Sequence, residues 1–407
     1  MVQSTVSVMI PTTSDRTESV TFTFNNGLAR SIAQQISDAL YAASPLTVTS
    51  VSGGGSIPAP GGGTQQLLLT GSPSGSVPGG YGFITDIAAG ATTVTAGSGT
   101  SLIISTGGGL FNLAGSATVA ASGGNNVVSQ TGSGTIQIGL AGAGANTITA
   151  GGSGTITGGT GTNVMNLTGN DVVVSYGNDT INAAGNSAVF GSSGSMLFVG
   201  GAGTSTVLGG TGSSSLTAGS GGVVFSANAD NNATVNASTS TATVFGGVGL
   251  NTFLIGGSGT AEQPSYMVTS GGAETLNAAG SSGAVWMSQS ADNNSTLMIA
   301  GSGNDTLITG MADGSATMVG GSGADRFVFF KQAIGGGSDV IVNFTSNDRV
   351  FIEGYASTGS ASQLQNDAIV GQGGVTLTLS DNTTITFSNL TSASQLNGMI
   401  HYGGPFV

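Results

Sequence analysis

Nine-residue units, each a glycine-rich turn followed by a short apolar strand, run without a spacer from Gly200 to Ser226. Their sequences are GGAGTSTVL, GGTGSSSLT and AGSGGVVFS. Glycine tolerates positive φ because it lacks a Cβ, so G-x-G makes a tight turn and the residues after it extend into a strand. One apolar residue per unit, Val207, Leu216 and Val224, is expected to point inward. No unit can bury that residue alone, so neighbouring units must stack, which predicts a parallel β-solenoid.

The same spacing extends in both directions and predicts an all-β fold with a solenoid over residues 81–328. At two units per coil this gives about 13 coils. Disorder is the alternative for a chain with 74 glycines, but disordered chains lack such an apolar periodicity. The other residues expected to point inward are Val119, Val128, Ile136, Ile148, Ile156, Met165, Val173, Ile181, Val189, Leu197, Val235, Val244, Phe253, Leu276, Val285, Leu297, Leu307, Met318 and Phe327.

The N-terminal residues 1–52 lack this spacing and predict a small α+β module. Residues 4–10 and 19–24 alternate polar and apolar side chains as strands do, and Asn25 and Asn26 can cap a helix that runs to about Ala43. A module of this size is marginally stable alone. We therefore expect it to cap the solenoid end or to dock on a neighbouring subunit. Residues 53–80, rich in Gly, Pro and Ser, predict a linker with one edge strand near 66–70.

The charge pattern excludes several classes of protein. Only 6% of the residues are charged, the formal net charge is −13, and no Lys or Arg lies between Arg30 and Arg326. Nucleic-acid binding requires cations that neutralise phosphates, so it is not expected. No apolar run approaches the about eighteen residues of a membrane-spanning helix, and the N-terminus lacks the features of a cleaved secretory signal. The absence of cysteine fits a protein that leaves the cell without disulfides.

Two units near the C-terminal end match a calcium-binding nonapeptide, G-G-x-G-x-D-x-U-x. GGSGADRFV (320–328) matches every fixed position, and AGSGNDTLI (300–308) matches all but the first glycine. Glycine turns aim backbone carbonyls inward and the Asp carboxylate adds charge, which supplies the hard oxygen ligands that calcium prefers. Asp305 and Asp325 are therefore the candidate carboxylate ligands. An Asp that only caps a turn needs no ion, and this alternative stays open.

With these repeats the chain resembles the repeats-in-toxin (RTX) family. Residues 337–355 and 375–396 look like that family's C-terminal flanking module, with Phe344 in a familiar place and Asn343 where an Asp is common. The resemblance therefore implies a β-rich module over residues 329–407. It further implies extracellular or cell-surface location in a Gram-negative bacterium, after type I export directed by the uncleaved C-terminus, which ends in Phe406 and Val407. The residues that it implies around one calcium ion between stacked turns are Asp305, Asp325, Asp339, Asp348, Gly301, Gly303, Gly321 and Gly323.

Most other units depart from the calcium pattern. Asp171 and Asp179 are weaker candidates because they are one unit apart and lie on opposite edges, and turn capping is the alternative for both. An Asn or Ser can bond its neighbours above and below without a metal, so most of the solenoid is expected to be metal-independent. The Asp position is filled by Asn126, Asn146, Asn163, Ser205, Ser214, Val223 and Asn251.

No catalytic motif is recognisable, and we do not expect an enzyme. His401 is the only histidine and lies near the C-terminal end, so an H-E-x-x-H zinc site is excluded and a Ser-His-Asp triad would have to recruit this residue. Trp286 is the only tryptophan. It could stack on a sugar, although a strand-face aromatic without a ligand is the alternative.

Two functions from different classes remain. The first is a structural protein that assembles head-to-tail into an extracellular fibre, a biofilm matrix or a surface layer, because an open solenoid presents unpaired strand edges at its ends. The second is an adhesin or binding module for a cell-surface glycan or for ice. Thr-x-Thr segments at 93–95, 147–149 and 155–157 could align as a flat ladder on such a module.

Overall fold

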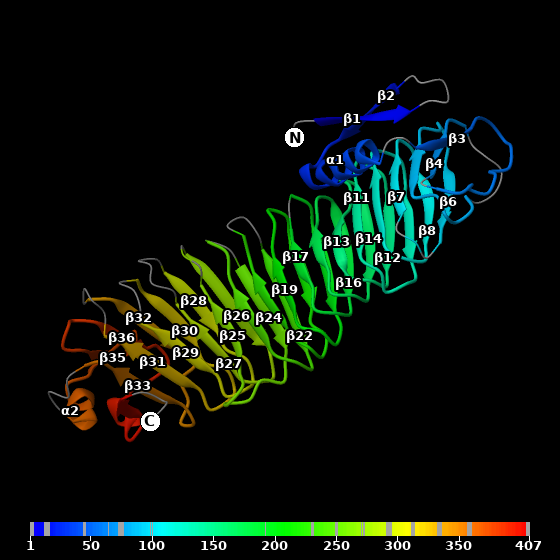
Figure 1. Ribbon diagram of the computed structural model, residues 1–407. Helices are drawn as coiled ribbons and strands as arrows, with labels where there is room; N and C mark the ends of the chain where they lie inside the picture. Colours follow the sequence, from blue (N-terminus) through cyan, green and yellow to red (C-terminus); the bar gives the residue numbers. More distant parts are fainter. Residues whose placement is uncertain are drawn as a thin grey trace. The chain divides into compact units, whose positions relative to one another are not determined.

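The structure, a computed structural model, describes residues 4–403 except 12–16, 44–45, 64, 72–76, 98, 100, 192, 229–231, 249–250, 270, 272, 290–294, 311–313, 332–335 and 356–359. Phe406 and Val407, at the expected export signal, lie outside the described residues. The protein is mostly β, with 7% helix, and forms a parallel β-solenoid of about 15 turns (Figure 1). The predicted fold class is therefore confirmed. Contacts divide the chain into two units, Met1–Thr206 and Val207–Val407.

Two parallel sheets, here named 1A and 1B, form the solenoid of the first unit. The chain passes from one sheet to the other at each turn, so consecutive strands belong to different sheets over most of the unit. Sheet 1A consists of β3 (Thr47–Val51), β4 (Gln65–Leu69), β5 (Phe83–Asp86), β7 (Ser101–Ser105), β9 (Ala117–Ala121), β11 (Ile136–Leu140), β13 (Gly154–Thr157), β15 (Val172–Val174) and β17 (Ala188–Phe190). Sheet 1B consists of β6 (Thr92–Ala96), β8 (Gly109–Leu113), β10 (Val127–Gln130), β12 (Asn146–Ala150), β14 (Thr162–Leu167), β16 (Asn178–Ala183) and β18 (Met196–Gly200).

The second unit repeats this arrangement with sheets 2A and 2B, and β19 (Ser205–Leu208) contains the boundary between the units. Sheet 2A consists of β21 (Val223–Ser226), β23 (Ala242–Phe245), β25 (Ser265–Val268), β27 (Val285–Ser288), β29 (Thr306–Thr309), β31 (Arg326–Phe330), β33 (Arg349–Glu353) and β37 (Ile400–Tyr402). Sheet 2B consists of β20 (Ser214–Thr217), β22 (Ala233–Ser238), β24 (Asn251–Gly256), β26 (Glu274–Gly280), β28 (Thr296–Ile299), β30 (Ala316–Val319), β32 (Ser338–Val342), β36 (Thr384–Phe387), β35 (Gly374–Thr378) and β34 (Ile369–Gly371).

The core consists of apolar side chains stacked in register from strand to strand. In sheet 1A the stack contains Val119, Ile138, Ile156, Val173 and Val189, all fully buried. Parallel pairing brings like side chains together on successive strands, so each apolar residue is covered by the next turn. Most of the residues that the spacing predicts to point inward do so.

Four of those predictions are wrong. Leu197 is 44% exposed and Phe253 is 37% exposed, and Val224 and Leu297 are half-buried on the outward side. In each case the adjacent residue is the buried one, namely Phe198, Leu254, Phe225 and Met298. A shift of one residue in a strand moves every side chain to the other face. A fixed nine-residue spacing gives Phe198, between Val189 and Val207, and Phe225, after Leu216. It misses Leu254, which lies ten residues after Val244, and Met298, which lies thirteen residues after Val285.

The ladder of sheet 1A begins before residue 81, at β3 within the expected N-terminal module, and continues through β4 within the expected linker. β4 pairs with β3 on one side and with β5 on the other, and all five of its residues are buried. The strand expected near 66–70 is therefore present, but it lies inside the sheet and not at its edge. Its three leucines supply the apolar side chains that a strand inside a sheet needs.

The N-terminal module packs on the outward face of sheet 1A. Helix α1 (Gly27–Ala42) contacts β7, β9 and β11, and the hairpin of β1 (Ser4–Pro11) and β2 (Thr17–Phe24) lies on its other side (Figure 1). Asn26 caps the helix through Oδ1, which accepts the N–H of Ala29 at 2.7 Å, and its Nδ2 donates to the Leu140 carbonyl at 2.9 Å. Gly139 permits the close approach, because a Cβ there would lie 2.8 Å from the Cα of Ala29. The module thus lies on the side of the sheet rather than over its end.

The C-terminal residues continue the solenoid instead of forming a separate sheet. β32 and β33 extend sheets 2B and 2A in parallel, and β34, β35 and β36 then form an antiparallel meander at the end of sheet 2B. Phe344 packs between Phe327 and Phe387, with ring centroids 5.8 and 5.0 Å away. Helices α2 (Ala361–Asn366) and η1 (Ala393–Leu396) contact each other in this region.

Candidate functional site

Three of the predicted calcium ligands, Asp305, Asp325 and Asp348, form one column along sheet 2A. Each immediately precedes a strand, β29, β31 and β33 respectively, and these strands are neighbours. All three side chains are buried. The structure therefore brings Asp348 together with the Asp305 and Asp325 pair.

The three carboxylates make the same pair of hydrogen bonds. Oδ1 of Asp325 accepts the N–H of Asp305 at 2.9 Å, and Oδ1 of Asp348 accepts the N–H of Asp325 at 2.8 Å. Oδ2 of Asp325 accepts the N–H of Gly321, in its own turn, at 2.8 Å. Asp305 and Asp348 follow the same rule, accepting one N–H from the preceding strand or turn and one from their own turn. Each Asp therefore ties its turn to the one before it.

The predicted glycines bring these turns into direct contact. A Cβ at Gly321 would collide with the carbonyl oxygen of Gly301, and one at Gly323 would collide with that of Gly303. Ser322 donates its N–H to the Gly301 carbonyl at 3.2 Å. Only glycine permits this stacking, which explains the spacing of glycine in both nonapeptides.

Asp339 lies apart from this column, on sheet 2B. Its Oδ1 accepts the N–H of Ala316 at 2.7 Å, whereas its Oδ2 is buried without a hydrogen-bond partner. Burial raises the pKa of Asp339 from 3.8 to about 7. A carboxylate with one unpaired buried oxygen is costly when ionised, so Asp339 favours its protonated form.

Burial also raises the pKa of Asp305 and Asp325. It is the main cause of the raised pKa of Asp305. The pKa of Asp325 is raised to about 6, first by burial and also by the charges of Asp305 and Asp348, against the lowering effect of its hydrogen bonds from the Asp305 and Gly321 amides. The column is thus a line of negative charge held by backbone donors.

The fit to calcium is partial. Carboxylate and carbonyl oxygens are the ligand types that calcium prefers, and the repulsion within the column would be relieved by a cation. Against this, both oxygens of each carboxylate already accept a backbone N–H. Among the described residues, no group of three or more His, Cys, Asp or Glu side chains is arranged to hold a metal ion.

In the first unit an amide ladder runs along sheet 1B, at positions where the calcium-binding nonapeptide has Asp. Asn126 donates from Nδ2 to Oδ1 of Asn146 at 2.9 Å, and Asn146 donates in the same way to Asn163 at 2.7 Å. Asn163 donates to Oδ1 of Asp179 at 2.6 Å, and all four side chains are buried. The predicted bonding of these Asn side chains to their neighbours above and below is therefore confirmed. It does not extend to Asn251, whose side chain is exposed.

The weaker candidates Asp171 and Asp179 are not brought together. Asp179 belongs to β16 of sheet 1B, whereas Asp171 precedes β15 of sheet 1A and accepts the N–H of Gly154 at 2.9 Å. Burial raises the pKa of Asp171 to about 6 and raises that of Asp179 as well. Each carboxylate has one buried oxygen without a hydrogen-bond partner.

The Thr-x-Thr segments do not form one ladder. Residues 93–95 and 147–149 lie in β6 and β12 of sheet 1B, with β8 and β10 between them, whereas residues 155–157 lie in sheet 1A. Leu110 and Val127 occupy the positions between Thr93 and Thr147. A regular threonine array for ice is therefore not present on these strands.

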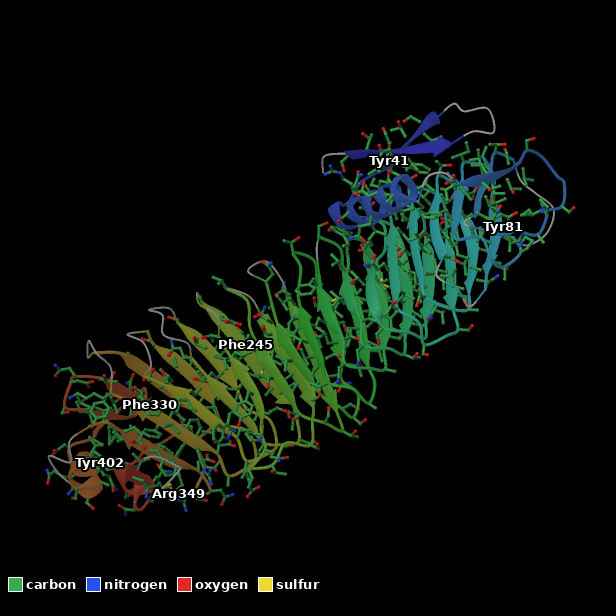
Figure 2. All side chains as sticks on the ribbon, viewed as in Figure 1. Tyr41, Tyr81, Phe245, Phe330, Arg349 and Tyr402 are labelled. Carbon is green, nitrogen blue, oxygen red and sulfur yellow. The ribbon has the colours of Figure 1, made fainter. Side chains whose placement is uncertain are left out.

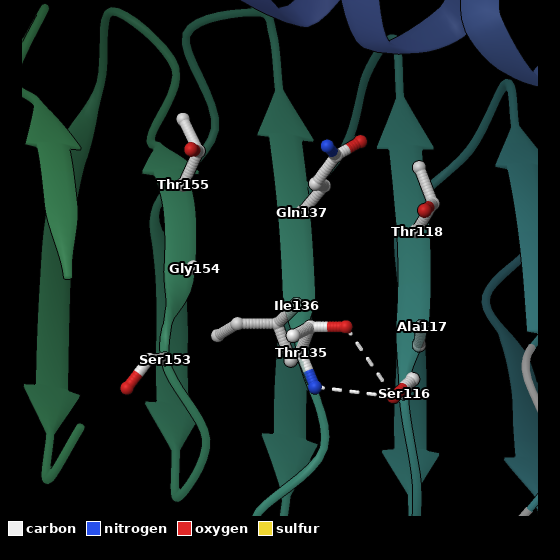
Figure 3. A pocket seen from close by; sticks show the side chains of 9 residues that line it. All are labelled: Ser116, Ala117, Thr118, Thr135, Ile136, Gln137, Ser153, Gly154 and Thr155. Carbon is white, nitrogen blue, oxygen red and sulfur yellow. Dashed lines mark hydrogen bonds between the residues drawn. The ribbon is translucent and has the colours of Figure 1, made fainter. Parts of the chain in front are cut away.

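One hollow on sheet 1A is lined by neutral side chains. It lies beside α1 across β9, β11 and β13, and Ser116 Oγ accepts the N–H of Thr135 at 3.1 Å within it (Figure 3). None of its lining residues titrates near neutral pH. The lining residues are Ser116, Ala117, Thr118, Thr135, Ile136, Gln137, Ser153, Gly154 and Thr155. His401 lies elsewhere, in sheet 2A, where its ring stacks on Phe351 with centroids 5.3 Å apart.

Sequence reasoning missed one group of residues, the basic side chains of sheet 2A. The scarcity of Lys and Arg argues against nucleic-acid binding but does not by itself point to these residues. Arg326 and Arg349 are direct neighbours in the ladder of β31 and β33. The signal in the sequence is that both directly follow an Asp of the column, Asp325 and Asp348.

The comparisons add no relative. No family model, no curated protein and no solved structure matches this chain. None of the helices in the described part of the chain is long and apolar enough to cross a membrane. The likeness to RTX repeats therefore rests on the two nonapeptides and the segment after them.

Proposed function

We propose that this protein is an extracellular structural β-solenoid that assembles head-to-tail into a fibre, matrix or surface layer. The observation that carries the proposal is the free edge of sheet 1A at β3. Among the described strands, β3 pairs with β4 alone. A free strand edge presents a row of N–H and C=O groups that a second chain can pair with.

The direction of the hydrogen bonds identifies which groups of β3 are on the free edge. Thr70 donates its N–H to the Val51 carbonyl at 3.0 Å, so Val51 faces the β4 side. Successive residues of a strand direct their N–H and C=O to alternate sides. Val48 and Ser50 therefore direct theirs away from β4, toward the position of an added strand.

The opposite partner in this assembly is β37, the last strand of sheet 2A. In the described residues it pairs with β33 alone. Sheet 2B, by contrast, ends in the antiparallel strands β35 and β34. We infer that β37 of one copy adds in parallel to β3 of the next, which gives a heterologous contact and hence an open polymer.

Calcium enters the proposal as a stabiliser of the C-terminal repeats. The residues that would hold it are Asp305, Asp325 and the carbonyls of the stacked glycine turns, with Asp348 at the next turn. The ion would neutralise the stacked carboxylates and would supply no reaction. The support for it is the match to the nonapeptide and the burial of like charges in one column.

Extracellular location and type I export are part of the same proposal. They rest on the resemblance of the C-terminal repeats to the RTX family and on the absence of cysteine. A strain that makes the full chain should release it into the medium only when a type I exporter is present. Intracellular retention under both conditions would contradict this part.

Paired substitutions at the free edge test the assembly. Val48→Pro removes an N–H from the free edge and leaves the groups that face β4 in place, because proline has no donor. Val48→Ala keeps the N–H and serves as the matched control. Electron microscopy should show polymers of the wild type and of Val48→Ala, and single molecules of Val48→Pro. Polymers of equal length in all three would refute assembly through β3.

A further inference from the structure

A line of aromatic and basic side chains crosses the outward face of sheet 2A. Tyr266, Trp286, Thr306, Arg326 and Arg349 occupy matching positions on the neighbouring strands β25, β27, β29, β31 and β33. Thr306, between the aromatic and the basic residues, is buried, whereas Trp286 and the two arginines are half-buried. Adjacent strands lie about 4.8 Å apart, so the five positions span about 19 Å. The line is straight because parallel pairing repeats the same position on every strand.

Two neighbouring arginines at one end of this line are unusual in a chain with so few basic residues. The chain has only five Lys and Arg residues and a net charge of −13. Three of the five lie close together in the sequence. Arg326 begins β31, Lys331 directly follows it, and Arg349 begins β33. Like charges on directly neighbouring positions of a sheet destabilise it. The pairing of Arg326 with Arg349 on one face therefore favours an anionic partner there.

The two arginines remain available to such a partner. Arg349 donates from one terminal nitrogen to the Ser346 and Asp348 carbonyls, at 3.2 and 2.6 Å, which orients the guanidinium and leaves its other donors unused. Arg326 is half-buried. Within the described part of the chain, no carboxylate forms an ion pair with either residue. Guanidinium groups bind carboxylate and sulfate oxygens in a fork geometry.

The aromatic end supplies a different type of contact. Tyr266 is 38% exposed, and its ring meets that of Trp286 edge to face with centroids 5.6 Å apart. Phe245, in the neighbouring outward row on β23, is also exposed (Figure 2). Rigid, partly exposed aromatic rings provide apolar faces on which a flat apolar surface, such as the C–H face of a sugar ring, can stack.

We propose that this outward face of sheet 2A binds an anionic polysaccharide that carries carboxylates or sulfates. Tyr266 and Trp286 stack on sugar rings, and Arg326 and Arg349 pair with acidic groups further along the same linear chain. A nucleic acid is the competing polyanion, and tighter binding of it is one of the outcomes of the test. The surface is separate from the strand edges of the proposed assembly, so either proposal can fail without the other.

Affinity electrophoresis of the full chain at low ionic strength tests the proposal, with polygalacturonate as the probe and its methyl ester as the uncharged comparison. The wild type should be retarded by polygalacturonate much more than by the ester, and added salt should weaken the effect. Arg326→Gln and Arg349→Gln should each weaken binding about tenfold, since each removes a charge-assisted hydrogen bond. Trp286→Ala should weaken it about fivefold or more, and Trp286→Phe less, because phenylalanine keeps a ring.

Two matched controls come from the first unit. Arg30→Gln removes a cation on α1, and Phe190→Ala removes an aromatic ring exposed on β17; both should bind as the wild type does. Should a glutamine variant fail to fold, Arg326→Lys keeps the charge but removes the fork, and should still weaken binding severalfold. The proposal is overturned by equal loss in Arg30→Gln and Arg326→Gln, by no retardation at low salt, or by tighter binding of oligo(dT) than of polygalacturonate.

Discussion

The backbone N–H of Asp305 donates a 2.9 Å hydrogen bond to the carboxylate of Asp325, one turn further along sheet 2A. The second oxygen of Asp325 accepts the N–H of Gly321. An asparagine has only one side-chain acceptor, so it would leave one of these amides facing an NH2 group.

We therefore expect Asp325→Asn to destabilise the second unit by about 2 kcal/mol at pH 8, the cost of one unsatisfied buried amide. Trp286, the only tryptophan, lies in β27 of the same unit. Its fluorescence during urea unfolding measures the effect. Asp367→Asn, at an exposed carboxylate of the same unit, is the control and should change the midpoint little. An unchanged midpoint in Asp325→Asn would show that the carboxylate does not hold the turns together.

The corresponding substitution Asp339→Asn should increase the stability at pH 8, whereas Asp325→Asn should decrease it. Its pKa is raised by burial from 3.8 to about 7, so the folded state binds this proton more tightly than the unfolded state. Stability from this group is therefore full below about pH 4 and is lost as pH rises toward 7, on the order of 4 kcal/mol in all. The pKa values of Asp325 and Asp171 are both raised to about 6, so these groups also make the folded state less stable as the pH rises.

Asp339→Asn keeps an acceptor for Ala316 and removes the buried charge. In EDTA it should raise the unfolding midpoint at pH 8, leave it nearly unchanged at pH 4.5, and flatten the slope between them. A variant that is less stable than wild type at pH 8 would contradict the assignment of Asp339 as a group that favours protonation.

Calcium should offset the repulsion within the column of carboxylates. We expect calcium to raise the urea midpoint of the wild type at pH 8, measured by Trp286 fluorescence, by several times more than that of Asp305→Ala. Magnesium, which prefers a tighter octahedral shell of ligands, is the control ion and should act weakly. Equal calcium responses in both proteins would place the ion elsewhere or show that none binds in this column.

Interrupting the amide ladder of the first unit should lower the stability by an amount that calcium does not change. Asn146→Ala removes the acceptor of two donors from Asn126 and the donor to Asn163, all buried, and should cost about 2–4 kcal/mol. Asn125→Ala removes one exposed bond to Ala145 and should cost under about 1 kcal/mol. Hydrogen exchange of the amides in β12 and β14 measures the difference, in EDTA and in calcium. Similar protection in both variants would mean that the ladder is not a source of stability.

Local periodicity predicted the solenoid but not the details of its register. Val207 and Leu216 point inward as predicted, and so does Phe225, nine residues after Leu216, so the prediction of Val224 departed from the spacing. Phe253 keeps the spacing from Val244 but is exposed, because ten residues separate Val244 from the buried Leu254. The amide ladder could be predicted, since Asn126, Asn146 and Asn163 recur at the Asp position. Contacts between distant segments could not. The packing of Ala29 on Gly139, the place of β4 inside sheet 1A and the pairing of Arg326 with Arg349 all depend on tertiary arrangement, which no local pattern encodes.

A cross-link between two copies reports whether β37 of one copy adds to β3 of the next. The chain has no cysteine, so Val48→Cys and His401→Cys variants each carry a single thiol on an outward position of the two edges. Two differently tagged proteins, one with each substitution, are mixed, allowed to assemble and oxidised. A disulfide should join the two differently tagged proteins, and little should form within either protein alone, because neighbouring strands bring such residues within disulfide range. Absence of the mixed product from assembled material, or equal self-linking of Val48→Cys, would contradict head-to-tail assembly.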